Sequence, residues 1–344
     1  MEKVYQLNQN QRSITLSEAI DNKEFPFHRD KAVSAKTPSI HFVNGFQIPI
    51  IGLGTYDMPT NQSVMDNIIN VAIDIGYRHI DTAYIYQNEE MIGKTLRDIF
   101  ANNKTKREDL FITSKVWSTY HKRSAVAEAL KLSLNNLGLD YLDLALIHWP
   151  IAVRSGTGYL WPLDENNQTL DDDISVVETW KGMEDAYRLG LAKSIGVSNF
   201  NSEQLSRVLK HTFIKPVVNQ FEIHPYLSQE KLVEFCHNNS IQVIAYCPIG
   251  KAHKGLLNEP ILTTIASNNN KTVPQVMLRW LIQRDIIIIP KTSKTYRLSE
   301  NFNIFDFQLT DEEMTEIFKL NKNMRFINPI EAINNKEYPF NREF

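Results

Sequence analysis

The stretch LDLALIHWP, residues 142–150, is a short β-rich run in which apolar residues give way to the polar His148. Further runs of this kind alternate along the chain with longer helix-patterned segments, which favours a parallel sheet with crossover helices. The candidate strands are Ile50–Thr55, Arg78–Asp81, Leu110–Lys115, Leu142–His148, Ser194–Ser198, Val217–Glu222, Gln242–Tyr246 and Ile286–Lys291. Eight such strands predict an α/β fold of the closed (β/α)₈ barrel type.

Most of these runs end by turning from apolar to polar or ionisable residues, namely Asp81, Lys115, His148, Ser198-Asn199, Gln220, Tyr246 and Lys291. A barrel gathers the carboxyl ends of its strands on one face, where active sites of this fold lie. Each residue alone is explained as a satisfied polar group at a strand end, but the whole set favours a site. An open doubly wound sheet is the alternative, and GLGTYD, residues 52–57, lacks the third glycine of its nucleotide fingerprint.

The amino-terminal boundary of the barrel is marked by a turn signal. Asn44-Gly45 stands between Phe42-Val43 and Phe46-Gln47-Ile48, which predicts a short β-hairpin. Residues before this point lack steady periodicity. We therefore expect a barrel domain over 39–344 and a poorly ordered extension over 1–38.

Composition excludes several classes of protein. The 344 residues are 42% hydrophobic and 22% charged, with a net charge of -3 and no basic block, so binding to nucleic acid by bulk charge is not expected. The longest apolar run, Ile286–Ile289, is followed at once by Pro290-Lys291, so no membrane span is expected. Two cysteines, Cys236 and Cys247, and no secretory signal indicate a cytoplasmic protein.

Several motifs in a fixed order carry a family resemblance. They are GYRHIDTAYIYQNE at 76–89, SKVW at 114–117, LIHWP at 146–150, GVSNF at 196–200, HPY at 224–226 and IPK at 289–291. From about Phe42 to Phe344 the chain closely resembles the aldo-keto reductase family, most of all its aldose and aldehyde reductase branch. The resemblance implies a (β/α)₈ barrel whose C-terminal tail lies over the active-site face.

The resemblance also implies a catalytic tetrad of Asp81, Tyr86, Lys115 and His148. Reducing a carbonyl group takes a hydride for carbon and a proton for oxygen, and Tyr86 matches the proton donor. Lys115 matches the cation expected to lower the pKa of that phenol, and Asp81 the partner that fixes this lysine. His148 matches the residue that orients the carbonyl oxygen. Each residue taken alone also has a structural explanation: Tyr86 as an aromatic residue at the edge of the core, Lys115 and Asp81 as an ion pair, and His148 as a packed imidazole.

The cofactor implied by the resemblance is NADPH. Ser198, Asn199 and Gln220 match contacts to the nicotinamide carboxamide, and Tyr246 matches the aromatic residue that stacks on its ring. Lys291 and Arg297 match the cations that hold a ribose 2′-phosphate; the alternative is a solvated basic turn before a helix. The remaining matched cofactor positions are Thr55, Thr292, Glu300 and Asn301. No metal site is expected.

Departures from the family pattern affect the substrate pocket and the cofactor loop. Tyr56 stands where the aldose reductase branch commonly has tryptophan, and Cys247 where a serine often follows the stacking tyrosine. The segment from Tyr246 to Pro260 is shorter than the family's belt over the pyrophosphate, so we expect faster cofactor exchange. Tyr56, Trp117, Trp149 and Trp161 are the candidate pocket walls, although tryptophans are often core residues.

The amino-terminal extension repeats the C-terminal tail. Residues 5–30 align without gaps to residues 318–343, and more than half of the positions are identical, as in NKEFPF at 22–27 and NKEYPF at 335–340. Chance does not explain such a match. A relic of tandem duplication, a misjoined reading frame and a working segment are all consistent with it.

The resulting hypothesis is a monomeric, NADPH-dependent reductase of aldehydes and some ketones, whose partner is a small carbonyl compound. Two alternatives stay open. One is a structural or regulatory subunit that keeps nucleotide but has little catalysis, against which the intact tetrad argues. The other is a reductase specialised for a ketosteroid or a prostanoid-like ketone.

Overall fold

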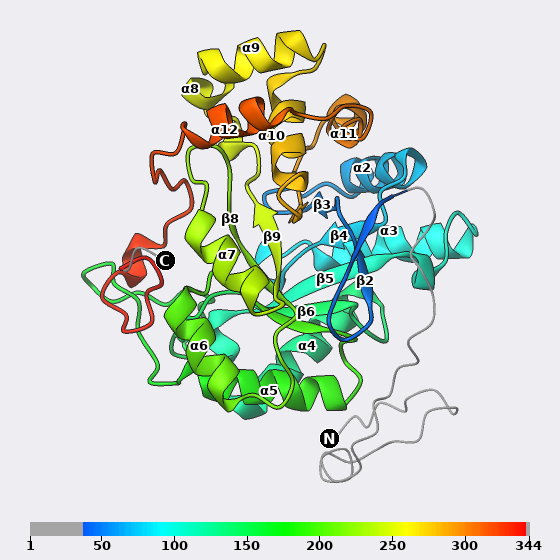
Figure 1. Cartoon of the computed structure of the whole chain (residues 1–344). Helices are drawn as coiled ribbons and strands as arrows, with labels where there is room; N and C mark the ends of the chain where they lie inside the picture. Colours follow the sequence, from blue (N-terminus) through cyan, green and yellow to red (C-terminus); the bar gives the residue numbers. More distant parts are fainter. Residues whose placement is uncertain (1–36, 342–344) are drawn as a thin grey trace.

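The strands form a barrel at the centre of the molecule. The computed structural model describes residues 37–341, and Figure 1 shows the helices packed around the strands. Within this range the sheet has eight parallel strands in the order β10-β9-β8-β7-β6-β5-β4-β3. Their bounds are β3 Leu53–Gly54, β4 His79–Asp81, β5 Phe111–Val116, β6 Leu144–Ile147, β7 Ile195–Ser198, β8 Val218–Glu222, β9 Gln242–Tyr246 and β10 Ile286–Ile288. The α/β barrel expected from the sequence is confirmed.

The first and last strands close the barrel. Ile51 forms a parallel bridge with Ile288. The Gly52 N–H donates to the Ile288 carbonyl at 2.8 Å, and the Ile288 N–H donates to the Ile50 carbonyl at 2.9 Å. β10 ends at Ile288, short of the predicted Lys291, where Pro290 has no N–H to continue a ladder.

The helices cover the outside of the barrel by burying one face each. α2 shows how the sequence sets such a helix: the Asn61 side chain caps it by accepting the Val64 N–H, and Gly76 at φ 127 ends it. The main helices are α2 Gln62–Ile75, α3 Glu89–Ala101, α4 Arg123–Leu137, α5 Val176–Arg188, α6 Ser202–His211, α7 Glu230–Asn238, α8 Lys254–Leu257, α9 Pro260–Asn268, α10 Val273–Ile282, α11 Thr295–Phe302 and α12 Asp311–Phe318. Around the barrel, α2 to α6 pack in chain order.

A β-hairpin covers the amino-terminal end of the barrel. β1 Ser39–His41 pairs antiparallel with β2 Gln47–Pro49, so the predicted hairpin is present. The turn runs from Phe42 to Phe46 around the predicted Asn44-Gly45, with Gly45 at φ 87. Phe42 and Ile48 are buried against Phe111 and other residues at the starts of the barrel strands.

The tail after α12 lies at the end of the barrel opposite to the hairpin. The backbone N–H groups of Phe326 and Ile327 donate to the buried Glu222 carboxylate at the end of β8, at 2.7 Å and 2.9 Å. The tail expected from the sequence therefore lies over the carboxyl ends of the strands. The repeat, residues 5–30, lies outside the described residues, as does the rest of the extension over 1–38 apart from residues 37 and 38.

Residues 37–341 contain neither a membrane-spanning helix nor a cluster of metal-ligating side chains. No helix in this range is both long and apolar enough to cross a membrane. No group of three or more histidine, cysteine, aspartate or glutamate residues in this range could hold a metal ion.

Candidate active site

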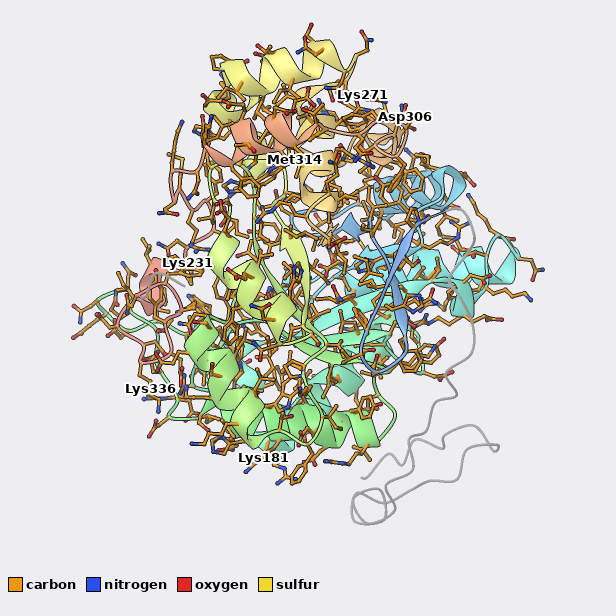
Figure 2. All side chains as sticks on the ribbon, in the orientation of Figure 1. Lys181, Lys231, Lys271, Asp306, Met314 and Lys336 are labelled. Carbon is orange, nitrogen blue, oxygen red and sulfur yellow. The ribbon has the colours of Figure 1, made fainter. Side chains whose placement is uncertain are left out.

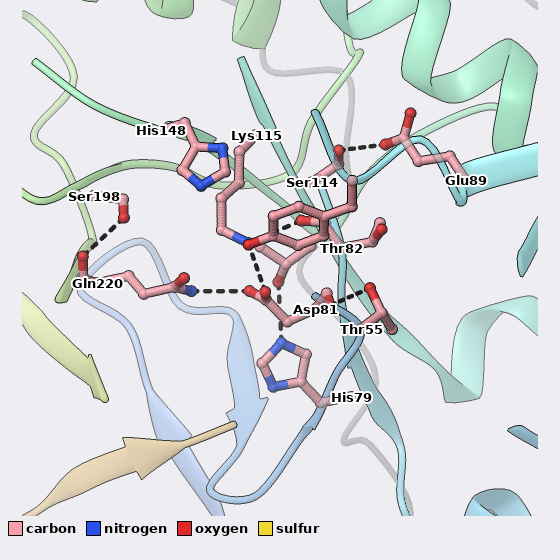
Figure 3. Close-up of polar contacts among 12 residues, drawn as sticks. Thr55, His79, Asp81, Thr82, Glu89, Ser114, Lys115, His148, Ser198 and Gln220 are labelled. Atoms are coloured by element: carbon pink, nitrogen blue, oxygen red, sulfur yellow. Dashed lines mark hydrogen bonds and ion pairs between the residues drawn. The ribbon is translucent and has the colours of Figure 1, made fainter. Parts of the chain in front are cut away.

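A buried ion pair lies at the carboxyl ends of β4 and β5. Lys115 Nζ donates to Asp81 Oδ1 at 2.5 Å and to the Thr82 carbonyl at 2.8 Å (Figure 3). Both side chains are almost completely buried. Asp81 Oδ2 accepts a further hydrogen bond from Gln220 Nε2 at 2.8 Å. The Asp81 carboxylate and the Thr82 carbonyl thus fix the ammonium, as a buried cation requires, and the Gln220 amide fixes the carboxylate.

Tyr86 brings its hydroxyl to this ion pair. It ends the 3₁₀ turn η1 Tyr84–Tyr86, and its OH lies 3.5 Å from Lys115 Nζ. Its ring stands edge-on to Tyr56 at a centroid distance of 5.2 Å and to His148 at 5.6 Å. Residues distant in the sequence therefore meet around one phenol.

The protonation of Tyr86 corrects one expectation from the sequence. Burial, and then the Asp81 carboxylate, raise the pKa of Tyr86 well above its ordinary value, so the expected lowering was wrong. The Lys115 ammonium lies 3.5 Å from this phenol but is paired with Asp81 at 2.5 Å, so it does not reverse the shift. The Tyr86 phenol is therefore protonated at neutral pH.

Lys115 and His148 are both affected by burial. Burial lowers the pKa of Lys115, and the adjacent Asp81 opposes that shift. Burial and the Lys115 charge lower the pKa of His148 well below its ordinary range, so this imidazole is neutral at physiological pH. Asn199 Nδ2 donates to the His148 carbonyl at 2.9 Å, which ties the end of β6 to the end of β7.

The residues expected at the nicotinamide form one hydrogen-bonded group beside the tetrad. Ser198 Oγ donates to the Gln220 carbonyl at 2.8 Å, and Asn199 Nδ2 donates to Ser198 Oγ at 3.2 Å. Tyr246 OH donates to Asn199 Oδ1 at 2.7 Å, which fixes the tilt of its ring. Thr55 is fully buried and donates to the Asp81 carbonyl at 2.9 Å.

The residues expected at the adenosine end lie after β10 and on α11. No side chain caps the start of this helix, and its first turn holds no acidic residue. The exposed Lys291 and Arg297 stand near its start, and Lys291 Nζ lies 3.7 Å from the exposed Asp57. Thr292 Oγ1 accepts the Lys294 N–H at 3.1 Å, Asn301 is buried and Glu300 is partly exposed. A helix start without a side-chain cap, beside two cations, fits a phosphate chemically.

Comparisons with known proteins agree with this geometry. The family model described as "Aldo/keto reductase family" matches residues 50–322. The chain belongs to the aldo/keto reductase family. It is 47% identical over 286 residues to Aldose reductase B of Dictyostelium discoideum, covering 82% of this chain and 92% of that protein. It is 40% identical to Estradiol 17 beta-dehydrogenase 5 of Mus musculus, covering 91% of this chain and all of that protein.

A solved structure supports the same assignment. The aldose reductase from Schistosoma japonicum superposes with a TM-score of 0.85 at 42% identity, over 89% of this chain and all of that one. The protein is thus an aldo/keto reductase, an oxidoreductase of the family that acts on carbonyl compounds.

The expected pocket residues of this reductase differ in their surroundings. Trp117 stands edge-on to His148 at 5.2 Å and lies 5.5 Å from Trp161, so both tryptophans lie near the tetrad. Trp149 is buried and meets the tail residue Phe340 at 6.0 Å. Tyr56 is 56% exposed beside Tyr86, so much of this residue is accessible to solvent.

Several residues around the pocket were not identified from the sequence. Ala332 and Tyr338 of the tail are buried in one apolar cluster with Trp117 and Trp149, and Ile327 packs against it. The tail has no regular periodicity that predicts such contacts. The repeat of this tail in the extension was the available signal, because the repeated NKE-aromatic-PF motif contains Tyr338.

The segment after Tyr246 is short and helical. It contains the 3₁₀ turn η4 Gly250–Ala252 and α8, and α9 begins at Pro260. Cys247, at φ 53, is partly buried, and burial raises the pKa of its thiol to about 12. The thiol is therefore protonated at neutral pH and is a weak nucleophile.

Proposed function

We propose that this protein reduces aldehydes and some ketones to alcohols with NADPH, and that Tyr86 donates the proton. The supporting observation is the placement of the protonated Tyr86 hydroxyl 3.5 Å from a lysine that is buried and fixed by Asp81. A proton donor of this kind faces the place where an alkoxide would develop. General acid catalysis of this type contributes about 10²- to 10⁴-fold to a rate.

Each tetrad residue has a separate role in this proposal. The Lys115 ammonium stabilises the phenolate that remains when the proton leaves Tyr86, since the two groups are in contact. Asp81 keeps that ammonium charged and in position. His148 is neutral, so it orients the carbonyl oxygen by a hydrogen bond and does not serve as the main acid.

NADPH would supply the hydride when bound. We propose that Ser198, Asn199 and Gln220 hold its carboxamide, and that the Tyr246 ring stacks on its nicotinamide. Lys291, Arg297 and the uncapped start of α11 form the phosphate end, which favours NADPH over NADH. Thr55, Thr292, Glu300 and Asn301 complete the proposed cofactor site. We propose a working monomer, because one chain supplies every member of the tetrad.

A second candidate substrate class is a large apolar ketone. The exposed side chains of Tyr159, Leu163 and Ile330 provide apolar surface on the 153–171 loop and on the tail. The Thr169 N–H donates to the Glu331 carbonyl at 2.9 Å, which joins these two segments. One similar protein is named for a dehydrogenase of estradiol, a steroid. These observations favour a steroid-like ketone as the alternative substrate.

The test is a panel of aldehydes, sugars and ketones, with consumption of NADPH followed by absorbance. Turnover of small aldehydes supports the first proposal, and a much higher kcat/KM on steroid-like ketones supports the second. Tight binding of NADPH without turnover on any member would instead favour a nucleotide-binding regulatory subunit.

A further inference from the structure

The tail is held on the barrel by a small set of contacts, which we call the tail site. It consists of Asn201, Gln204 and Arg207 at α6, together with Trp149 and Glu222. Arg207 makes a bidentate ion pair with the buried Glu337, with N–O distances of 2.8 Å and 2.5 Å. Gln204 Nε2 donates to the Glu337 carbonyl at 2.8 Å. Glu337 is therefore the main polar anchor of the tail.

The amino-terminal repeat keeps the residues that dock the tail. The buried positions between 320 and 341 are Leu320, Ala332, Asn335, Glu337, Tyr338 and Pro339. Their counterparts in residues 5–30 are Leu7, Ala19, Asn22, Glu24, Phe25 and Pro26. The one difference, tyrosine to phenylalanine, removes a hydroxyl that bonds only within the tail, to Asn328. Arg325 and Phe340, which stack on each other, also recur as Arg12 and Phe27.

The exposed positions of the repeat have changed more. Eleven positions from 319 to 341 are exposed, and seven of them differ: Lys319, Lys322, Met324, Asn328, Ile330, Asn334 and Asn341 correspond to Gln6, Gln9, Gln11, Thr15, Ser17, Asp21 and His28. The other four, Asn321, Asn323, Ile333 and Lys336, recur as Asn8, Asn10, Ile20 and Lys23. Five of the six buried positions are thus identical in the repeat, whereas seven of the eleven exposed positions differ. This pattern is expected when one docking surface constrains both sequences.

We propose that the tail site has a second ligand, residues 5–30 supplied by another molecule of this chain. Docking within one molecule is disfavoured by the path that the chain must take. Thr37 donates to the Gly76 carbonyl at the end of α2, and residues 28–36 span at most about 30 Å. A path from α2 to α6 around α3, α4 and α5 is about 35 Å at ordinary helix spacing, and the chain must also climb from one end of the barrel to the other.

The molecule's own tail competes with this second ligand. It follows directly from α12, so its effective concentration at the tail site is high and it occupies the site in a dilute monomer. Docking from another molecule is expected at high protein concentration or when the tail is weakened. Such an exchange keeps the anchors but replaces Met324, Phe326 and Ile330 with Gln11, Ser13 and Ser17. Since Phe326 contacts the rings of His224 and His253, the exchange also loosens that end of the tail.

Cross-linking of the full-length protein tests this proposal. Lys336 forms an ion pair with the exposed Asp173, and Lys23 is its counterpart in the repeat. In Asp173→Cys/Lys23→Cys protein, a short bismaleimide is expected to give a covalent dimer. The dimer yield should rise about tenfold when Glu337→Lys weakens the tail, and fall about tenfold again when Glu24→Lys is added.

A matched control places the first cysteine elsewhere. Asp306 is also an exposed aspartate paired with a lysine, and Figure 2 shows it well away from Lys336. A dimer yield no higher than that of Asp306→Cys/Lys23→Cys, also carrying Glu337→Lys, would overturn the proposal. A cross-link within one molecule would overturn it too, because the repeat would then dock on its own barrel.

A peptide measurement keeps the test independent of the stability of the variants. A labelled peptide of residues 5–30 is titrated into the unaltered full-length protein beside the same peptide carrying Glu24→Lys. About tenfold weaker binding of the altered peptide is expected. Equal binding of the two peptides, or no binding even to protein in which Glu337→Lys weakens the tail, would refute recognition at Arg207.

Discussion

The proton-donor centre and the adenosine end hold their cations in opposite ways. Lys115 is completely buried, and three partners fix it: Asp81, the Thr82 carbonyl and the Tyr86 hydroxyl. Arg297 is exposed on the first turn of α11, and Lys291 has only a 3.7 Å contact with the exposed Asp57. One cation is thus preorganised before any ligand arrives, and the others are left accessible to one.

This difference reflects how each charge is stabilised, by partners in the protein or by water. A buried charge must be matched by partners in the protein, so the tetrad is assembled from the ends of β4, β5 and β6 and from the turn η1. An exposed charge keeps its water and contributes mainly when an anion binds. Changes at the buried centre should therefore alter chemistry strongly, and changes at the exposed end should alter affinity moderately.

Replacement of Tyr86 should give the largest effect. Tyr86→Phe removes the proposed acid but keeps the ring between Tyr56 and His148, so kcat should fall by about 10²-fold or more. The dissociation constant for NADPH should stay near that of the parent. Tyr84→Phe, in the same 3₁₀ turn, is the matched control and should change kcat by less than about threefold. Equal rates for Tyr86→Phe and parent on a reactive aldehyde would rule out Tyr86 as the acid.

Replacement of Arg297 should give a moderate effect confined to NADPH. Arg297→Ala removes a charge-assisted contact to the 2′-phosphate, which should weaken NADPH binding by about 1.5 to 3 kcal/mol and hardly change NADH binding. The difference should shrink at high salt, because this cation is exposed. Fluorescence titration of both nucleotides measures it, and Lys271→Ala, whose ammonium pairs with Asp306, is the control. Equal weakening of both nucleotides would show that Arg297 does not bind the phosphate.

His121, a buried histidine outside the tetrad, should affect the free energy of unfolding and its dependence on pH. His121 is buried, its ring nitrogens have no hydrogen-bond partner among the described residues, and burial lowers its pKa to about 3. The unfolded imidazole titrates near pH 6.5, so the unfolded state binds a proton between the two values and the folded state does not. The free energy of unfolding is therefore highest above about pH 6.5 and falls as the pH falls.

The size of this effect follows from the gap between the two pKa values. At pH 5 the loss due to His121 is about 2 kcal/mol relative to pH 7. His121→Phe keeps an aromatic ring that does not titrate, so its unfolding free energy should fall by about 2 kcal/mol less over this interval. Urea unfolding of parent and variant at both pH values measures the difference. Identical pH dependence in the two proteins would mean that His121 is protonated in the folded state.

The regular parts of the fold could be predicted because strand ends repeat a local pattern. Runs such as Ile195–Ser198 are apolar until their last residue, and in a barrel that residue must lie on the site face. The positions of Asp81, Lys115 and His148 follow from this rule. Strand lengths were less predictable. The end of β10 before Pro290 and the bridge between Ile51 and Ile288 depend on pairing with a neighbouring strand, which the sequence of one strand does not specify.

The protonation of Tyr86 and the path of the tail could not be predicted in the same way. The pKa of a phenol depends on its burial and on every charge around it, including the Asp81 carboxylate that balances Lys115. The tail is held by isolated contacts such as Glu337 with Arg207, which lie far apart in the sequence and follow no period. Long-range contacts of this kind require the folded structure.

Deletion of residues 1–36 should have the smallest effect. The hairpin that covers the barrel begins at Ser39, and the tail site is filled by the molecule's own tail, which outcompetes the repeat through its short tether. Folding and turnover of the deletion variant should therefore stay close to those of the full-length protein at micromolar concentration. Aldehyde kinetics, thermal unfolding and light scattering distinguish the possible outcomes. A large loss of stability without a change in mass would show that the repeat docks on its own barrel. A change from oligomer to monomer at this concentration would show that exchange between molecules outcompetes the tethered tail, and the balance between the two copies of the sequence would then be the reverse of the one expected here.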